Sequence, residues 1–188
     1  MVGETGSGKS TLAKVLVGIE HPEQGEILFG GTPLNCRDYR KTNHLIRYIF
    51  QDAARSLSPN QKISDILHAV LRYSTVLNEE QRNEKIADTL KLLGFAKTVN
   101  MAIITRICFL GSITNVALAR ALILDPKVLI LDEALTALDP SLRAQIVNLL
   151  LDLQQKTGLS YILITNQLRL KDMGILPTKP WSYTKVGV

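Results

Sequence analysis

Residues 3–11 read Gly3-Glu4-Thr5-Gly6-Ser7-Gly8-Lys9-Ser10-Thr11. The glycines allow the backbone to curl with positive φ, so that successive N–H groups point inward at a phosphate. Lys9 supplies a charge for the β- and γ-phosphates, and the Ser10 hydroxyl is placed to ligate Mg²⁺. The apolar helix expected over residues 11–18 directs the positive end of its dipole at the same anion. A glycine-rich turn would explain neither Lys-Ser-Thr nor this helix, so all nine residues are predicted to bind a nucleoside triphosphate.

The composition is that of an ordinary globular protein. Of the 188 residues, 46% are hydrophobic and 21% charged, and no apolar stretch has the length of a membrane span. We expect no signal peptide, and Cys36 and Cys108 predict a reducing compartment without a disulfide framework. A net charge of +5 is compatible with nucleic acid or an anionic membrane surface. However, the Lys and Arg residues are scattered and only 5% of residues are aromatic, which favours a solvated surface and no nucleic-acid partner.

The pattern of apolar residues predicts an α/β fold. Strands are expected over residues 25–29, 45–50, 128–131 and 160–165, and helices over residues 63–71, 79–93, 116–124 and 140–158. Strands that alternate with helices predict a mostly parallel sheet with flanking helices, as in a P-loop NTPase. Residues from about 60 to 115 interrupt the alternation and are interpreted as an inserted helical lobe within one domain, 1–188. Residues from about 168 to 188 include two prolines and show no period, so a poorly ordered tail is expected.

The strand expected over residues 128–131 ends in two acids, Asp132 and Glu133. In a P-loop fold we expect this strand to lie beside the strand that leads into the loop. Asp132 would then reach Mg²⁺, and Glu133 would polarise an attacking water. An apolar run followed by two acids is common in other proteins, and the loop at residues 3–11 gives it this meaning.

These motifs together resemble those of the ATP-binding subunit of an ABC transporter. In this reading residues 3–11 are the Walker A motif, Gln51 the Q-loop, residues 119–122 the helix after the signature, Asp132-Glu133 the Walker B motif and residues 136–139 the D-loop. Residues 50–59 are similar to the Q-loop of oligopeptide and dipeptide importers. Residues 132–139 resemble those of the Sap-type peptide transporter branch. A soluble P-loop kinase is disfavoured by the D-loop and by Ala119-Arg-Ala-Leu122.

The resemblance implies a mechanism and a set of partners. Two such subunits sandwich two ATP molecules with Mg²⁺, and hydrolysis drives two membrane-spanning permease subunits, which receive cargo from a peptide-binding protein. The chain is therefore expected at the cytoplasmic face of the bacterial inner membrane. Gln51 would sense Mg²⁺ and the γ-phosphate, Gln167 would stand at the switch position, and Asp139 would communicate across the dimer. Taken without its flanking residues, Gln51 would be only a polar loop residue.

The sequence also departs from the family pattern. The family's N-terminal strands, including the aromatic residue that stacks on adenine, are missing, so we expect a domain that is incomplete at both ends. Residues 108–112 read Cys-Phe-Leu-Gly-Ser where the family has Leu-Ser-Gly-Gly-Gln, and Gln167 replaces the switch histidine. We hypothesise that residues 98–115 and 174–186 are frame-shifted sequence. The alternative function is therefore a truncated, frame-damaged product that binds nucleotide weakly and is not a competent ATPase.

Overall fold

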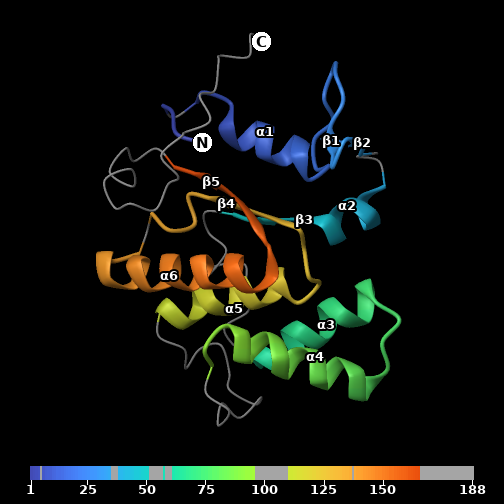
Figure 1. Cartoon of the computed structure of the whole chain (residues 1–188), viewed down its shortest axis with the longest axis vertical. Helices are drawn as coiled ribbons and strands as arrows, with labels where there is room; N and C mark the ends of the chain where they lie inside the picture. Colours follow the sequence, from blue (N-terminus) through green and yellow to red (C-terminus); the bar gives the residue numbers. More distant parts are fainter. Residues whose placement is uncertain are drawn as a thin grey trace.

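A parallel sheet forms the centre of the molecule (Figure 1). The computed structural model describes residues 1–4, 6–34, 38–50, 57, 61–95, 110–136 and 138–165. Three strands in the order β3 (Ile46–Ile49), β4 (Val128–Asp132) and β5 (Ser160–Ile164) are paired in parallel. Val2 adds an isolated parallel bridge to Thr165, just beyond β5. The predicted α/β fold with a mostly parallel sheet is therefore confirmed.

Helices cover both faces of this sheet, which explains why β4 is a continuous apolar run. On one face, α1 (Lys9–Leu16) and the residue after it pack on the sheet, where the cluster includes Ala13, Val17, Ile46, Ile130 and Ile164. On the other face, Leu129 and Leu131 contribute to the larger core with α5 (Leu110–Leu122) and α6 (Pro140–Thr157) (Figure 1). Alternate residues of β4 thus point to opposite layers.

The position of β4 differs from our expectation. We expected the strand that ends in Asp132 to lie beside the strand that leads into the loop, and this is wrong. Val2 pairs with Thr165, and β5 lies between that position and β4. Since neighbouring strands lie about 4.8 Å apart, Asp132 belongs to a strand roughly 10 Å from the start of the loop. The site must therefore span the end of β5.

The long helix α6 follows the signals at its two ends. Asp139 Oδ1 accepts a hydrogen bond of 2.9 Å from the backbone N–H of Leu142, and Pro140 is the first helical residue. Gly158 ends the helix with a φ of 69°, a conformation in which a side chain would be strained. Its apolar face buries four residues: Ile146, Val147, Leu150 and Leu153. The predicted helix from residue 140 to residue 158 is thus confirmed.

The helices below the sheet in Figure 1 form one packed layer with α5. Both α3 (Ile63–Ser74) and α4 (Glu79–Leu92) contribute buried residues to the larger core. Asn78 and Gln81 form a capping box at the start of α4. The helix α5 begins at Leu110 and so continues across residue 115, where we placed the end of the inserted lobe. The boundaries of that lobe remain a prediction.

Two elements were not expected. A short hairpin pairs β1 (Leu28–Phe29) with β2 (Thr32–Pro33) through Gly30 and Gly31, whereas we expected one strand over residues 25–29. The helix α2 (Tyr39–Leu45) leads directly into β3.

None of the helices in the described ranges combines the length and hydropathy that a membrane span requires. The expected tail at 168–188, Cys36 and Cys108 lie outside the described residues.

Candidate functional site

The loop at the start of α1 has the backbone shape that an anion site requires. Gly6 and Gly8 have φ of 85° and 84°, in the left-handed region that strains any other residue. Gly8 is the N-cap of α1, so the first N–H groups of the helix point toward the loop. Ser10 and Thr11 follow on the exposed first turn. The predicted curl of the backbone is therefore present, while Thr5 lies outside the described residues.

Lys9 lies inside this loop. Its side chain is only 8% exposed, and its Nζ donates hydrogen bonds to the carbonyl oxygen of Glu4 at 2.5 Å and to Ser7 Oγ at 2.9 Å. Ser7 Oγ in turn donates to the same carbonyl at 2.8 Å. A Cβ on Gly3 would lie 3.1 Å from Ser7 Oγ, so glycine keeps room for this arrangement. The ammonium group is thus held at the centre of the loop, where an entering phosphate would meet it.

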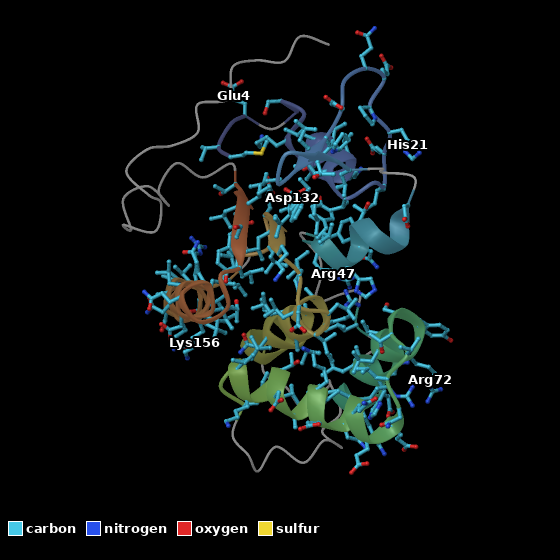
Figure 2. The ribbon with its side chains drawn as sticks, turned by 45° about the vertical axis from the view of Figure 1, so that its right-hand side comes forward. Glu4, His21, Arg47, Arg72, Asp132 and Lys156 are labelled. Atoms are coloured by element: carbon cyan, nitrogen blue, oxygen red, sulfur yellow. The ribbon has the colours of Figure 1, made fainter. Side chains whose placement is uncertain are left out.

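Asp132 ends β4 on the same side of the sheet as α1. The side chain is 6% exposed, and Figure 2 shows it on the side that α1 covers, with Glu4 of the loop above it. Its Oδ2 accepts a hydrogen bond of 2.5 Å from the hydroxyl of Tyr48, on β3. Burial, followed by this hydrogen bond to Asp132, raises the pKa of Tyr48, which therefore remains a donor at neutral pH.

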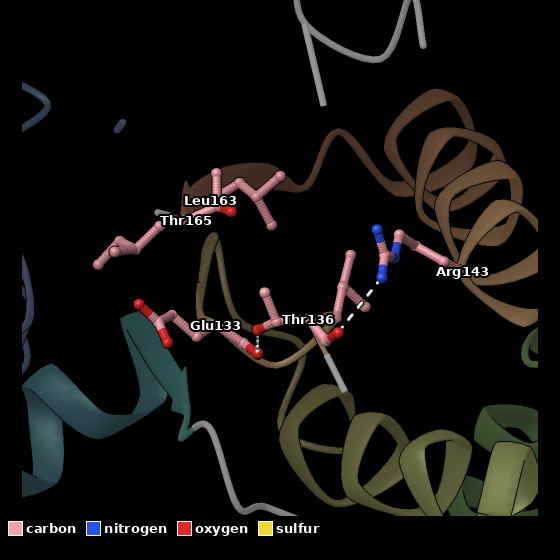
Figure 3. Close-up of a pocket in the computed structure, with 7 residues that line it drawn as sticks. Glu133, Thr136, Arg143, Leu163 and Thr165 are labelled. Atoms are coloured by element: carbon pink, nitrogen blue, oxygen red, sulfur yellow. Dashed lines mark hydrogen bonds between the residues drawn. The ribbon is translucent and has the colours of Figure 1, made fainter. Parts of the chain in front are cut away.

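Glu133 has an unusual backbone. Its φ is 49°, in the left-handed region that is uncommon for residues with a side chain. Its N–H donates to the carbonyl oxygen of Ile164 at 3.0 Å, and its own carbonyl accepts hydrogen bonds from the N–H and hydroxyl of Thr136. Figure 3 shows the carboxylate directed away from Arg143, on the side of Thr165. The turn after β4 thus places Glu133 at the end of the sheet where the loop begins.

The described residues fit a magnesium–nucleotide complex. Asp132 Oδ1 is buried and has no hydrogen-bond partner among the described residues, which leaves one carboxylate oxygen available to a cation. Within the described ranges, no group of three or more His, Cys, Asp or Glu side chains could hold a metal. Mg²⁺ is commonly bound by one or two protein oxygens, substrate phosphates and water. Asp132 and Ser10 therefore supply the kind of ligand that Mg²⁺ takes beside a nucleotide.

Other predicted site residues are placed only in part. Gln51 and Gln167 lie outside the described residues. Asp139 is exposed and caps α6, so its position has a structural explanation as well as the predicted one. Tyr48 and Arg143 were not predicted from the sequence: Tyr48 contacts Asp132, 84 positions further along the chain, and Arg143 bonds backbone carbonyls of the preceding turn, five and seven positions before it. The sequence around Tyr48, Ile-Arg-Tyr-Ile, carried no signal that this side chain would reach Asp132.

Comparisons with known proteins give similarities to ATP-binding proteins of transporters. A model of the family described as ABC transporter matches residues 1–136. The peptide transport system ATP-binding protein SapF of Salmonella typhimurium is 46% identical over 168 residues, covering 89% of this chain and 62% of that protein. The SapF of Escherichia coli K12, named a putrescine export system ATP-binding protein, has the same identity and coverage.

Two further similarities extend the comparison. The dipeptide transport ATP-binding protein DppF of Escherichia coli K12 is 40% identical over 171 residues, covering 89% of this chain and 51% of that protein. The solved structure of CbiO1 from Clostridium perfringens, part of the ABC transporter complex cbiONQ, superimposes with a TM-score of 0.77 at 30% identity, covering 88% of this chain and 65% of that one. This chain thus spans 62% of the length of the SapF relatives. By its matched residues and its fold, the chain belongs to the ABC transporter family of ATP-binding proteins.

Proposed function

We propose that this chain is an ATP-binding and ATP-hydrolysing subunit that energises peptide transport. One observation carries the proposal: the loop that holds Lys9 and the two acids at the end of β4 lie at the same end of the sheet. The loop follows Val2, which pairs with Thr165, and the N–H of Glu133 donates to the adjacent Ile164. A phosphate-binding loop, a metal-ligating carboxylate and a general base are the parts that ATP hydrolysis needs.

Each residue has a role in this proposal. The backbone of residues 3–8 and the ammonium of Lys9 hold the β- and γ-phosphates, while Ser10, Asp132 and Gln51 supply oxygens for Mg²⁺. Bound Mg²⁺ would neutralise phosphate charge. Glu133 orients a water and accepts its proton, and Gln167, at the family's switch position, would offer the γ-phosphate a hydrogen-bonding group. The turn that positions Glu133 is hydrogen-bonded to β5 at Ile164.

The partners follow from the family. The chain would pair with a second ATP-binding subunit, with Asp139 near the contact between them, and would act on two membrane-spanning permease subunits. A peptide-binding protein would deliver cargo, and the chain would lie at the cytoplasmic face of the inner membrane. The family membership and the names of the SapF and DppF relatives support these partners.

Peptides are the proposed cargo because the Salmonella SapF and DppF relatives are named for peptide and dipeptide transport. Putrescine is the second candidate, since the Escherichia coli SapF at the same 46% identity is named for putrescine export. Membrane vesicles that carry this chain with its permease would separate the two candidates. ATP-dependent movement of a labelled peptide supports the first, and movement of putrescine without peptide supports the second.

Substitution of the general base tests the enzymatic part. Glu133→Gln removes the proton acceptor but keeps the size of the side chain, so ATP turnover should fall by about 10²- to 10⁴-fold while Mg-ATP still binds. Glu80→Gln, an exposed substitution in the first turn of α4, is the matched control and should retain turnover.

Three results are distinguishable in this experiment. Loss of turnover in Glu133→Gln alone supports the proposal. A wild-type chain that binds Mg-ATP without any turnover supports the alternative, a product that is not a competent ATPase. The residues Cys-Phe-Leu-Gly-Ser at 108–112 favour that alternative, because Phe109 and Leu110 replace the family's serine and first glycine there. A wild-type chain that does not bind Mg-ATP contradicts the proposed enzyme and agrees with a damaged product.

A further inference from the structure

We propose that Tyr48 is a positioning residue that orients the Asp132 carboxylate so that Oδ1 faces the metal. This inference rests on the proposed function and deepens it, because it adds a residue to the site that no family motif contains. The hydroxyl of Tyr48 donates a hydrogen bond to Asp132 Oδ2 at 2.5 Å, across 84 positions of sequence.

The register of the sheet explains how the two side chains meet. Tyr48 of β3 is paired with Ile130 of β4. Ile130 packs in the cluster under α1, and Asp132 lies two residues further along the same strand, so both side chains are on the α1 face. A tyrosine that leans along its strand spans the diagonal between positions offset by two residues.

The hydrogen bond gives the two oxygens of the Asp132 carboxylate different surroundings. Oδ2 is occupied by Tyr48, whereas Oδ1 is buried and has no hydrogen-bond partner in the described part of the chain. A carboxylate held at one oxygen cannot rotate freely about its terminal bond. Oδ1 therefore remains the carboxylate oxygen that is available to a cation.

The ring of Tyr48 is itself held in place. The rings of Tyr48 and Phe50 pack edge to face, with ring centroids 4.3 Å apart and an interplanar angle of 76°. Tyr48 also packs in the cluster that includes Ile46 and Ile130. Because these apolar contacts would survive the loss of the hydroxyl, Tyr48→Phe removes the hydrogen bond and little else.

The test separates metal binding from nucleotide binding. We would measure the affinity of the full chain for a fluorescent ATP analogue, once in excess EDTA and once in saturating Mg²⁺. Electron paramagnetic resonance would measure the binding of Mn²⁺, as the only divalent metal, to the chain in the presence of ATP. Loss of a hydrogen bond that orients a metal ligand typically costs about 10- to 100-fold in metal affinity. Tyr48→Phe should weaken Mn²⁺ binding by about that factor and leave the affinity in EDTA unchanged.

Tyr161→Phe is the matched control. Tyr161 lies on β5, on the other side of β4 from Tyr48, is also half-buried, and donates a hydrogen bond of 2.6 Å to the carbonyl oxygen of Leu150 in α6. The substitution therefore removes one tyrosine hydroxyl and one hydrogen bond without touching Asp132. It should leave Mn²⁺ binding at the wild-type value.

Four results would overturn the inference. Equal effects of Tyr48→Phe and Tyr161→Phe, or a loss of affinity by Tyr48→Phe in EDTA as large as in Mg²⁺, would show a merely structural role. If the wild-type chain binds ATP but Mn²⁺ binding is the same in Tyr48→Phe, the positioning role is wrong and the proposed function stands. If the wild-type chain binds neither ATP nor Mn²⁺, the proposed function fails and this inference fails with it.

Discussion

Arg143 in α6 donates a hydrogen bond of 3.2 Å from its Nη2 to the carbonyl oxygen of Thr136, in the turn that carries Glu133 (Figure 3). The same nitrogen donates to the carbonyl of Leu138 at 2.9 Å. The turn is therefore held from two sides, by α6 through Arg143 and by β5 through the Glu133–Ile164 hydrogen bond. Such support is needed because Glu133 has a positive φ that the chain would otherwise avoid.

Arg143→Met should destabilise the protein. The methionine keeps an apolar stem but leaves two half-buried carbonyl oxygens without their donor, which we expect to lower the free energy of unfolding by about 1–3 kcal/mol. Urea unfolding followed by circular dichroism measures the change. Arg72→Met, on the exposed surface of α3, is the control and should change the free energy by less than about 0.5 kcal/mol. Equal effects of the two substitutions would show that Arg143 does not stabilise the turn.

Asp139 has a structural role that can be separated from the proposed one. Asp139→Ala removes the cap of α6 and should lower the free energy of unfolding by about 0.5–2 kcal/mol. Asp139→Asn keeps a capping oxygen and should preserve stability, while the loss of charge should lower ATP turnover if Asp139 communicates across a dimer. Stability and turnover measured on both variants check this. If Asn is as destabilising as Ala, the cap is not the source of the effect.

Tyr161 should make the stability depend on alkaline pH. Burial raises its pKa from 10.0 to about 12, so the folded chain keeps a proton that the unfolded chain loses first. Unfolding then releases a proton between these values, and the free energy of unfolding should fall as the pH rises from 10.0 to about 12. Tyr161→Phe should reduce the slope of that decline, whereas Tyr73→Phe, a change at an 87% exposed ring, should not. An identical slope in Tyr161→Phe and the wild type would contradict the prediction.

The parts of the fold that depend on local signals could be predicted from the sequence. The positive φ of Gly6 and Gly8, the cap at Asp139 and the end of α6 at Gly158 each follow from one residue and its neighbours. The apolar run of β4 likewise predicts a strand buried on both faces. By contrast, α2 has the sequence Tyr-Arg-Lys-Thr-Asn-His-Leu, which lacks an apolar period and so gave no helix signal.

The arrangement of the site could not be predicted, because it depends on which strands become neighbours. The bridge between Val2 and Thr165 places β5 inside the site, and nothing near residue 132 encodes that order. The hydrogen bond from Tyr48 to Asp132 likewise requires the register between β3 and β4. The residues that perform the proposed chemistry were visible in the sequence, whereas the residues that position them emerged only from the structure.

Calorimetric titration of the chain with Mg-ATP tests whether the loop is a working nucleotide site. The wild-type chain should bind, and Lys9→Met should weaken binding by about 10-fold or more, because it removes the buried ammonium that faces the phosphates. Lys14→Met is the control: Lys14 lies in the same helix, and the substitution removes only its surface ion pair with Glu20. This variant should bind Mg-ATP as the wild type does. A wild-type chain that does not bind Mg-ATP, or a Lys9→Met chain that binds it as tightly as the wild type, would contradict the proposed nucleotide site.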